Sequence, residues 1–305
     1  MQYDVIIIGG GPAGYTAGIY AARGGLTTLV LTGPLPGGQL VNTTDVENYP
    51  GFAHGILGPD LMIAMKQQTK QVGAQVLDKQ VVGVDFSKLP FSVKTRKEIF
   101  TCKSVIIATG ATPRKLDVVG EKEFSGKGVS YCALCDGPFF KDKVLVVVGG
   151  GDAAMEEANF LSKFGVEVHL IHRREAFRAS KAMQNKVFAN KKITIHWNTQ
   201  VVEVKGEGIV SSVVLKNNKT GKNSELAVGG VFVSIGHVPN TQLFKGHLEL
   251  DKMGYVALKK SMMTSVSGVF AAGDVHDHSY RQAVTAAGYG CMAAIELERW
   301  LGEKH

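Results

Sequence analysis

The chain has 305 residues but only four cysteines, and no apolar run in it is long enough to cross a membrane. Cysteines so few and so scattered cannot form the disulfide framework of a small secreted protein, which favours a reducing, cytoplasmic location. A membrane-spanning helix needs roughly 20 consecutive apolar residues, so we expect no membrane segment. The first residues, Met1 to Asp4, lack the basic stretch and the cleavage site of a signal peptide, and we expect none.

Long runs of basic residues are also absent, although the formal net charge is +7 at pH 7. Proteins that bind nucleic acid usually concentrate lysine and arginine in one stripe or patch. The dispersed charge therefore predicts no binding of nucleic acid, and it favours attraction of anionic small molecules and acidic partner proteins. Glycine, in contrast, is abundant, with 37 residues. The length is sufficient for two domains of ordinary size.

A buried strand followed by a glycine-rich turn opens the chain. Tyr3 to Ile8 is a run rich in β-branched residues that is typical of a buried parallel strand. It is followed by the turn Gly9-Gly10-Gly11-Pro12-Ala13-Gly14, an alanine-rich helix from Tyr15 to Arg23 and a strand from Leu26 to Leu31. In this context the GxGxxG pattern indicates a dinucleotide site. Gly9 permits the tight turn, Gly11 lets the backbone approach a pyrophosphate, and Gly14 lets helix and strand pack closely.

The same order of elements occurs again in the middle of the chain. Val144 to Val148 is a buried strand, followed by the turn Gly149-Gly150-Gly151-Asp152-Ala153-Ala154, a helix through about Phe164 and a strand from Val166 to Ile171. Each repeat closes with a similar strand–Gly–x–x–Pro segment, Val105 to Pro113 (with Ala108, Thr109 and Gly110) and Val231 to Pro239. Two such motifs predict an α/β protein with two dinucleotide sites.

The two sites differ where the ribose of the dinucleotide is expected. About 20 residues past the glycines, an acid binds a free 2′-hydroxyl group and arginines bind a 2′-phosphate. After the second motif this place is occupied by His172-Arg173-Arg174-Glu175-Ala176-Phe177-Arg178. Arginine donates two parallel hydrogen bonds to phosphate, so we predict NADPH over NADH there, with a solvated basic turn as the alternative. After the first motif, Leu31-Thr32-Gly33 supplies neither an acid nor an arginine.

A pair of cysteines lies between the two motifs, in Cys132-Ala133-Leu134-Cys135. Such a pair is either half of a structural zinc site or a redox-active dithiol. Zinc needs four ligands, and the other cysteines, Cys102 and Cys291, stand alone in a strand-like run and in an alanine-rich helix. The position between two dinucleotide sites therefore favours a dithiol that receives electrons from cofactors, without a metal.

Asp136 directly follows the dithiol and is our candidate proton donor and acceptor. The alternative is that Asp136 only forms the turn before Gly137. If the cysteine pair begins a helix or a turn, backbone N–H groups would stabilise a thiolate there.

Two further segments are candidates for cofactor contacts. Gly37-Gly38-Gln39-Leu40 is a loop of small residues whose backbone N–H groups and amide suit a continuation of the first cofactor groove. Gly268 to Asp274 is a short buried strand that ends in Gly273 and a carboxylate, which suits the hydroxyl groups of a flavin. A plain turn at 37–40 and a capping role for Asp274 are the alternatives.

Taken together, these segments resemble the low-molecular-weight, bacterial-type thioredoxin reductases, over nearly the whole chain. The resemblance is carried by Gly9–Gly14, Gly37–Leu40, Glu47–Gly51, Ala108–Gly110, Cys132–Gly137, Gly149–Glu157, His172–Arg178, Gly268–Asp274 and Arg281-Gln282-Ala283. It implies two Rossmann-like dinucleotide-binding domains. An NADPH domain at 114–243, which carries the cysteine pair, would be inserted in a discontinuous FAD domain at 1–113 and 244–305. It also implies a homodimer, tightly but not covalently bound FAD, and thioredoxin as the disulfide substrate.

The resemblance also implies roles for single residues. Asp274 would bind the ribityl chain of the flavin, and Asn48 would lie near the flavin ring. Arg281, Gln282 and Ala283 would flank that ring, and Glu157 would belong to the NADPH site. Cys135 would exchange electrons with the flavin, while Cys132 would attack the disulfide of thioredoxin.

Chain order predicts a domain movement, because the dithiol and the NADPH site share one domain and both must touch the same flavin. We expect two domain arrangements with hinges near Thr112–Lys115 and Asn240–Lys245, as in the family. Phe139 and Phe140, with Lys127 nearby, are a candidate docking patch for an acidic thioredoxin, although core packing is an alternative for at least one phenylalanine. Pro138 stands where the family often has an aromatic residue, which leaves the choice of partner open.

Two other functions stay open at this point. A flavoenzyme of the same family could reduce another redoxin or oxidise dithiols with oxygen, and the arginine cluster favours NADPH input over these branches. A nucleotide-sensing protein could keep the fold without turnover, but the retained Cys132, Cys135 and Asp136 argue against it.

Overall fold

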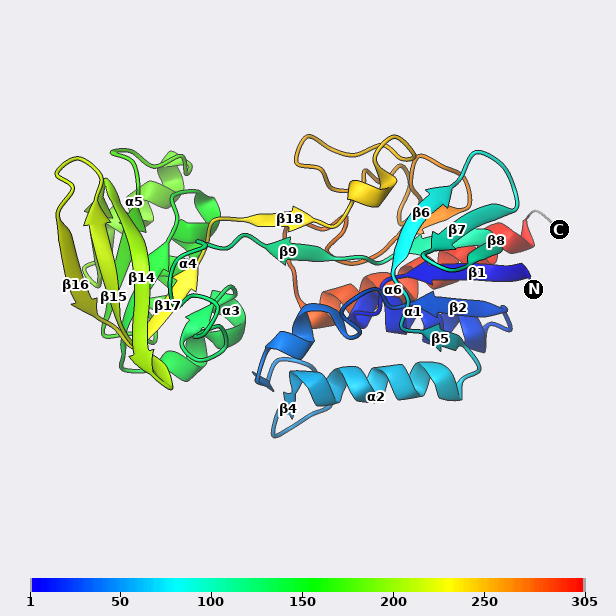
Figure 1. Ribbon diagram of the computed structural model, residues 1–305, viewed down its shortest axis with the longest axis horizontal. Coiled ribbons are helices and arrows are strands. Elements are labelled where there is room, and N and C mark those ends of the chain that lie inside the picture. The colour runs from blue at the N-terminus through cyan, green and yellow to red at the C-terminus, as the bar shows by residue number, and fades with distance from the viewer. Residues whose placement is uncertain (1, 304–305) are drawn as a thin grey trace. The chain divides into compact units, whose positions relative to one another are not determined.

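The protein, described here by a computed structural model of residues 2–303, consists of two compact units (Figure 1). Unit 1 contains the residues up to Thr112 and from Val238 onward, and unit 2 contains Pro113–His237. The first crossing lies next to the predicted boundary, whereas the second comes before the predicted 243/244. The reason is that Asn240, inside the predicted insertion, donates its backbone N–H to Gly110 and its side-chain amide to the Thr109 carbonyl, both in unit 1.

Unit 1 is built on a seven-stranded sheet with the order β5-β2-β1-β8-β7-β6, in which β19 also pairs with β8. The parallel strands are β1 (Gln2–Ile8), β2 (Thr28–Leu31), β5 (Gln75–Leu77), β8 (Ile99–Ile107) and β19 (Val269–Ala271). The strands β6 (Val81–Asp85) and β7 (Phe91–Thr95) continue the sheet in antiparallel pairing. The helices are α1 (Pro12–Arg23), α2 (Gly58–Gln71) and α6 (Ala283–Gly302).

Both faces of this sheet are covered, which explains the apolar run from Val5 to Ile8 in β1. Successive side chains of a strand point to opposite faces. Val5 and Ile7 pack in the cluster that includes α1 and α6, while Ile6 and Ile8 pack in a second cluster with Phe91. A strand that is buried on both sides needs no polar positions.

Smaller elements complete unit 1. They are η1 (Gly38–Asn42), β3 (Asp45–Val46), β4 (Ile56–Leu57) and η3 (Gln242–Phe244). The two crossings run side by side as a two-stranded sheet of β9 (Ala111–Pro113) and β18 (His237–Pro239) (Figure 1).

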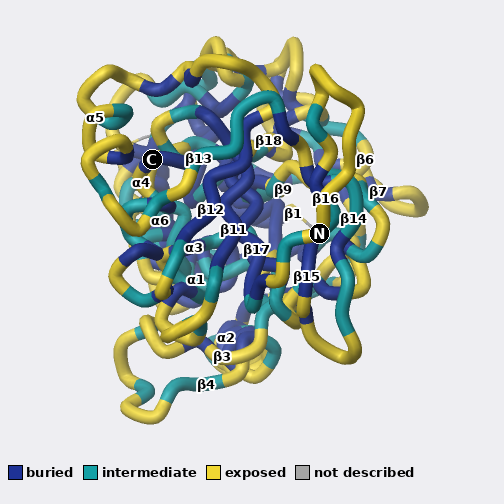
Figure 2. Tube along the Cα trace, turned by 90° about the vertical axis from the view of Figure 1, so that its left-hand side faces the viewer, coloured by how far each residue is buried: buried dark blue, intermediate teal, exposed yellow. Residues whose placement is uncertain are grey.

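Unit 2 contains a parallel sheet with the strand order β10-β17-β11-β12-β13. Its strands are β10 (Val129–Ser130), β11 (Val144–Val148), β12 (Glu167–His172), β13 (Ile193–Trp197) and β17 (Gly230–Val233). One face packs against α4 (Asp152–Leu161) and α5 (Lys181–Ala189). The other face packs against the antiparallel sheet of β14 (Thr199–Glu207), β15 (Ile209–Asn217) and β16 (Asn223–Ala227). The central strands are therefore buried, as Figure 2 shows for β11, β12 and β17.

The two units thus repeat one pattern of parallel strand, glycine turn, helix and parallel strand, in β1–α1–β2 and in β11–α4–β12. This confirms the predicted α/β class with two Rossmann-like units. No helix within residues 2–303 combines the length and the apolar character that a membrane span requires.

Candidate functional site

The first glycine turn leaves one open position among its three motif glycines. Gly9 has φ +126°, and a Cβ atom on it would lie 2.0 Å from the Ala108 carbonyl oxygen. A Cβ atom on Gly14 would lie 2.0 Å from the Gly9 carbonyl oxygen. Gly11, at φ −88°, has no atom within 4 Å of its Cβ position. Gly9 and Gly14 therefore serve the fold, while Gly11 faces open space at the start of α1.

Three segments that are distant in sequence meet at this turn. The Gly37 N–H donates to the Gly10 carbonyl at 2.8 Å, and a Cβ atom on Gly38 would lie 3.4 Å from the Gly11 Cα. A Cβ atom on Gly273 would lie 2.9 Å from the Ala13 Cβ. The predicted 37–40 loop includes Gln39 and Leu40, which lie in η1. The structure thus brings this loop and the segment that follows β19 to the first glycine turn.

Helix α6 reaches the same place through small residues. A Cβ atom on Gly290 would lie 2.2 Å from the Ala13 carbonyl oxygen, so only glycine allows this approach of α6 to α1. The helix begins at Ala283, and Gln282 is its N-cap in a reciprocal capping box with Thr285. Arg281, just before the cap, has a left-handed backbone at φ +49°, a strained conformation that often occurs at binding sites.

Two predicted flavin contacts, Asn48 and Gln282, lie next to each other. The Asn48 side-chain amide donates to the Gln282 Oε1 at 3.3 Å, although the two residues are far apart in the chain. Nearby in sequence to the cap, Asp274 is mostly buried, and burial together with the neighbouring Asp277 raises its pKa to about 6, against the influence of Arg281. A buried carboxyl group of this kind is suited to accept hydrogen bonds from ligand hydroxyl groups.

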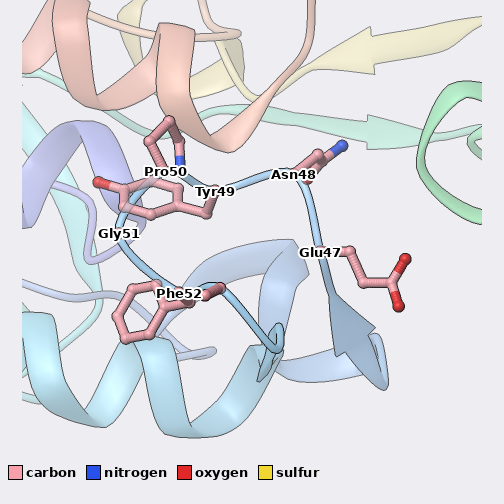
Figure 3. Close-up of a pocket in the computed structure, with 7 residues that line it drawn as sticks. Glu47, Asn48, Tyr49, Pro50, Gly51 and Phe52 are labelled. Carbon is pink, nitrogen blue, oxygen red and sulfur yellow. The ribbon is translucent and has the colours of Figure 1, made fainter.

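The loop that carries Asn48 curves around a cavity of 510 Å³, which is lined by residues 47–53. Figure 3 shows the rings of Tyr49 and Phe52 on one side of the loop and the Glu47 carboxylate pointing away from them. The two ring centroids are 6.3 Å apart. Both rings also pack against the core of unit 1, so the loop that holds Asn48 has a fixed base.

Two buried polar atoms of unit 1, which sequence reasoning missed, have no hydrogen-bond partner among the described residues. They are the Tyr15 hydroxyl group on α1 and the Nε2 atom of His276. Buried polar atoms without a hydrogen-bond partner are rare in folded proteins, so a ligand or a water molecule is expected to bind to them. Tyr15 is the residue after the GxGxxG turn, and His276 follows Asp274 by two positions. No sequence pattern distinguishes either residue from an ordinary core residue.

The second glycine turn repeats the division of labour found in the first. A Cβ atom on Gly149 would lie 2.4 Å from the Ser234 carbonyl oxygen, whereas Gly151, at φ −102°, has no atom within 4 Å of its Cβ position. Ala153 and the fully buried Ala154 follow in the first turn of α4, and Glu157 lies half-buried one turn later. Gly151 again faces open space at a helix N-terminus, where phosphate groups bind.

The arginine segment is fastened to this turn. The Arg178 N–H donates to the Gly150 carbonyl at 2.8 Å, and the Asp152 carboxylate accepts hydrogen bonds from the backbone and the hydroxyl group of Ser180 at 2.9 and 2.7 Å. The side chains of Arg173, Arg174 and Arg178 are exposed. The predicted 2′-phosphate ligands therefore lie on a loop whose backbone is held at its C-terminal end.

His172 has a different place from the arginines that follow it. Its ring is buried, with Nδ1 at 3.1 Å from the Gly149 carbonyl oxygen and Nε2 at 2.9 Å from the Ala176 carbonyl oxygen. Burial lowers its pKa. The ring thus ties the arginine segment to the glycine turn, while the three arginines of this segment are exposed.

The cysteine pair forms a disulfide bond at the start of a short helix, α3 (Ala133–Asp136). Cys132 is the N-cap, and its Sγ accepts the Cys135 backbone N–H at 3.1 Å. Of the two forms left open by the sequence, a helix or a turn, the pair begins a helix. Cys102 is fully buried, with its pKa raised to about 12 by burial, and Cys291 is half-buried. Within residues 2–303, no group of three or more His, Cys, Asp or Glu side chains is arranged to hold a metal ion.

Asp136 closes the short helix and is mostly buried. Burial raises the pKa of its carboxyl group, while a hydrogen bond from the Ser130 hydroxyl at 2.5 Å works in the opposite direction. Ser130 was not among the predicted site residues, because a serine at the end of a strand has no distinguishing pattern.

The segment after the dithiol, η2 (Gly137–Phe140), contains both phenylalanines of the predicted docking patch, but it places them in different environments. Phe139 is 41% exposed, whereas Phe140 packs edge-to-face on Phe232 with ring centroids 5.0 Å apart. Leu134, between the two cysteines, is 54% exposed. Lys127 is exposed as well. The apolar surface next to the disulfide is thus formed by Leu134 and Phe139, and core packing is the role of Phe140.

Comparison with known proteins agrees with this geometry. The model of the pyridine nucleotide-disulphide oxidoreductase family matches residues 3–290. The chain is 52% identical to the thioredoxin reductase of Streptomyces clavuligerus, covering 98% of this chain and 94% of that protein. It is 51% identical to NADPH-dependent thioredoxin reductase 3 of Arabidopsis thaliana, covering 98% of this chain and 58% of that protein. It is also similar to the solved structure of the thioredoxin reductase from Giardia duodenalis, with a TM-score of 0.94, 48% identity and 99% of each chain covered.

Proposed function

Because the chain belongs to the pyridine nucleotide-disulphide oxidoreductase family, we propose that it is an NADPH-dependent thioredoxin-disulfide reductase. The observation that carries this proposal is the Cys132–Cys135 disulfide at the start of a helix, in a chain with two open glycine turns. FAD, when bound, supplies the carrier that passes two electrons from NADPH to the disulfide. Thioredoxin is the protein that the reduced dithiol then reduces.

The residues of unit 1 fit FAD. The open position at Gly11 gives a pyrophosphate access to the N-terminus of α1, and the loop at Gly38 borders the same space. The raised pKa of Asp274 and the unpartnered Tyr15 hydroxyl group are consistent with polar ligand groups that complete this site. Asn48, Arg281, Gln282 and Ala283 would lie against the flavin ring.

The residues of unit 2 fit NADPH. Gly151 gives the pyrophosphate access to the N-terminus of α4, and the exposed Arg173, Arg174 and Arg178 would hold the 2′-phosphate. His172 and Asp152 would act indirectly, because their hydrogen bonds hold the arginine segment on the glycine turn.

The position of Cys132 suits a nucleophile. After reduction, its sulfur would still have the Cys135 N–H and the N-terminus of α3 next to it, and these favour the thiolate over the thiol. Cys132 would attack the disulfide of thioredoxin, and Cys135 would close the intramolecular disulfide again. Asp136, with a raised pKa, would take up and return the proton.

Turnover also requires unit 2 to present first the dithiol and then the nicotinamide to the flavin. We propose that unit 2 rotates about the β9–β18 crossings. Support comes from the hydrogen bonds of Asn240 to Thr109 and Thr112, which tie the second crossing to unit 1 up to that residue. Gly236, at φ +95°, precedes β18 and offers a conformation that other residues rarely adopt. The pivot would then lie between Gly236 and Asn240 on one crossing and at Pro113–Lys115 on the other.

Exposed apolar side chains support the proposals for the protein partner and for the homodimer. Leu134 and Phe139 beside the disulfide offer a docking surface for thioredoxin, with Lys127 as the cation for an acidic partner. Tyr20 on α1, Ile63 on α2 and Met292 on α6 are exposed apolar residues of unit 1, and they offer surface for a second copy in a homodimer. A dithiol that must be kept reducible suits the cytoplasm.

The decisive experiment is NADPH oxidation with and without the host's thioredoxin. Cys132→Ser should lower thioredoxin reduction by roughly a thousandfold or more, because the nucleophile is removed, while bound FAD and its reduction by NADPH persist. Cys291→Ser is the matched control, since this cysteine lies on α6 and outside the dithiol, and it should keep full activity.

Other outcomes would reject the proposal. A colourless protein that NADPH does not reduce would be no flavoenzyme. A yellow protein that NADPH bleaches, but that reduces no thioredoxin, would be a reductase of another redoxin or a dithiol oxidase of the same family.

A further inference from the structure

The hydroxyl group of Ser130 lies at the centre of the polar atoms around the dithiol. Ser130 is the last residue of β10 and is 4% exposed. Its Oγ lies 2.5 Å from Asp136 Oδ2, 3.1 Å from the Cys132 backbone nitrogen and 3.3 Å from the Cys132 carbonyl oxygen. One of these neighbours is a donor, one is an acceptor, and the third, Asp136, changes from acceptor to donor when it takes up a proton.

Building on the proposed function, we propose that Ser130 is a positioning residue that holds the Asp136 carboxyl group in one place in both of its protonation states. A hydroxyl group has one proton and two lone pairs. With Asp136 ionised, Ser130 donates its proton to Oδ2 and accepts the Cys132 N–H. With Asp136 protonated, Asp136 donates to the second lone pair, and the Ser130 proton turns to the Cys132 carbonyl oxygen.

The reaction requires both of these states in each turnover. When the dithiol reduces a substrate disulfide, the Cys132–Cys135 bond forms, the substrate S–S bond breaks, and two electrons and two protons pass to the two substrate sulfurs. Asp136 accepts one of these protons from the dithiol and returns it to a substrate sulfur. Because Ser130 exchanges donor for acceptor, the carboxyl group needs no movement and loses no hydrogen bond between the two steps.

The backbone around Ser130 is held firmly enough for this role. Ser130 pairs with Phe232 in the parallel ladder of β10 and β17. On the other side of Ser130, the Tyr131 hydroxyl donates to Glu121 at 3.1 Å. The Glu121 carboxylate is buried and also accepts the backbone N–H groups of Leu116 and Asp117, at 2.9 and 2.7 Å. The segment that carries Ser130 into the dithiol is therefore fixed by a strand pairing and by a buried carboxylate.

The surroundings of Asp136 make its pKa sensitive to the Ser130 hydroxyl group. Burial raises the pKa of Asp136 and the hydrogen bond from Ser130 lowers it. Titratable groups on the elements next to α3 include Asp152, Glu156 and Glu157 on α4, Tyr131 before the dithiol and, after reduction, the two thiols. Removal of the hydroxyl group should therefore raise the pKa of Asp136 further and leave its position less defined.

The test uses the FAD-loaded enzyme with thioredoxin and compares three variants. Ser130→Ala should lower the turnover number roughly tenfold to a hundredfold, because a hydrogen bond to a charged group is lost. It should also move the limb of the pH–rate profile that Asp136 controls to higher pH by roughly one to two pH units. Ser130→Thr keeps the hydroxyl group and should restore both the rate and the profile to near those of the unmodified enzyme.

Ser212→Ala is the matched control. Ser212 is also a buried serine of unit 2 whose hydroxyl donates to a carboxylate, that of Glu225 at 2.6 Å, but it lies on β15 outside the dithiol segment. It should leave the rate and the pH profile unchanged. Reduction of bound FAD by NADPH should proceed equally in all variants, because that step does not involve the dithiol.

Two results would overturn the role of Ser130. One is a Ser130→Ala enzyme with turnover and pH profile within twofold and a few tenths of a pH unit of the unmodified enzyme. The other is reduced turnover with an unmoved pH profile, which would give Ser130 only a structural part. Failure of the proposed function looks different, since then the unmodified enzyme itself would not reduce thioredoxin.

Discussion

Two partly buried carboxyl groups, Asp136 and Asp274, are the side chains for which we propose a role in chemistry rather than in stability. Burial raises the pKa of both. A carboxylate that is withdrawn from water without a full set of partners destabilises the folded state. Such groups persist where a substrate, a cofactor or a proton transfer uses them. The two lie in different units, one beside the disulfide and one at the end of β19.

The pH dependence of the flavin-free protein should reveal the cost of Asp274. Its pKa rises from 3.8 to about 6 on folding, so its contribution to stability is full below pH 3.8 and is lost as the pH rises through about 6. At pH 7 the ionised group should cost roughly 3 kcal/mol of the free energy of unfolding. Asp274→Asn should remove this cost, so the flavin-free variant should resist urea better at pH 7, with little difference near pH 4.

The exposed Asp45, changed to Asn, is the control for this experiment and should leave urea unfolding unchanged at both pH values. In the FAD-loaded state the order should reverse, because Asp274→Asn would weaken the binding of FAD. A flavin-free Asp274→Asn protein that is less stable than the unmodified one at pH 7 would mean that the carboxylate is needed for the fold.

The strand–turn–helix elements divide their glycines into two kinds. Gly9 and Gly149 carry backbone that another carbonyl group approaches so closely that no side chain fits. Gly11 and Gly151 have ordinary φ values and empty space at the Cβ position. Only the first kind is required by the fold, since alanine adopts the backbone of the second kind without strain. We propose that the absence of a side chain at Gly11 and Gly151 serves the approach of a ligand.

Alanine substitutions should separate these two roles. Gly11→Ala should change the free energy of unfolding of the flavin-free protein by about 0.5 kcal/mol or less. It should weaken FAD binding roughly tenfold or more, because the added methyl group would stand in the path of the pyrophosphate. Gly9→Ala should destabilise the fold by roughly 3 kcal/mol or more, because its Cβ atom would overlap the Ala108 carbonyl. Urea unfolding and the flavin content after ultrafiltration are the two measurements.

The second turn provides an internal replicate. Gly151→Ala should raise the KM for NADPH and leave FAD bound, while Gly149→Ala should destabilise the fold. Equal effects of Gly9→Ala and Gly11→Ala on stability would contradict the division into a structural and a ligand-facing glycine.

Two crossings of the chain connect the two units. They pair as β9 and β18, and the Arg114 N–H donates to the Gly236 carbonyl at 2.9 Å at the side of unit 2. Asn240 makes the corresponding bonds at the side of unit 1. The rotation proposed above, which would give a dithiol and a nicotinamide alternate access to one flavin, would take place about these crossings.

Cross-linking of the two units should therefore stop turnover. An amine-reactive cross-linker that joins a peptide of 113–237 to a peptide of unit 1 should lower thioredoxin reduction at least roughly tenfold, while FAD stays bound. A monofunctional reagent of the same chemistry is the control, and mass spectrometry identifies the linked peptides. Unchanged turnover in protein that is fully linked between the units would exclude the rotation.

Much of this protein is readable from local sequence. Two glycine turns, each between a buried strand and an alanine-rich helix, determined the fold class and predicted both nucleotide sites, because the backbone of a GxGxxG turn permits few other arrangements. The Cys132–Cys135 spacing indicated a helix or a turn, and the structure shows a helix in which the N-cap Cys132 side chain accepts the N–H three residues later.

Tertiary structure alone decided the contacts between segments that are far apart in the chain. It brought Gly38 and Gly273 to the first glycine turn, turned the His172 ring inward, buried Phe140 and set the second crossing before Asn240. It also placed the Ser130 hydroxyl on Asp136. These outcomes depend on packing and hydrogen bonds between elements, for which neither a periodicity nor a short motif exists, so only the folded chain could reveal them.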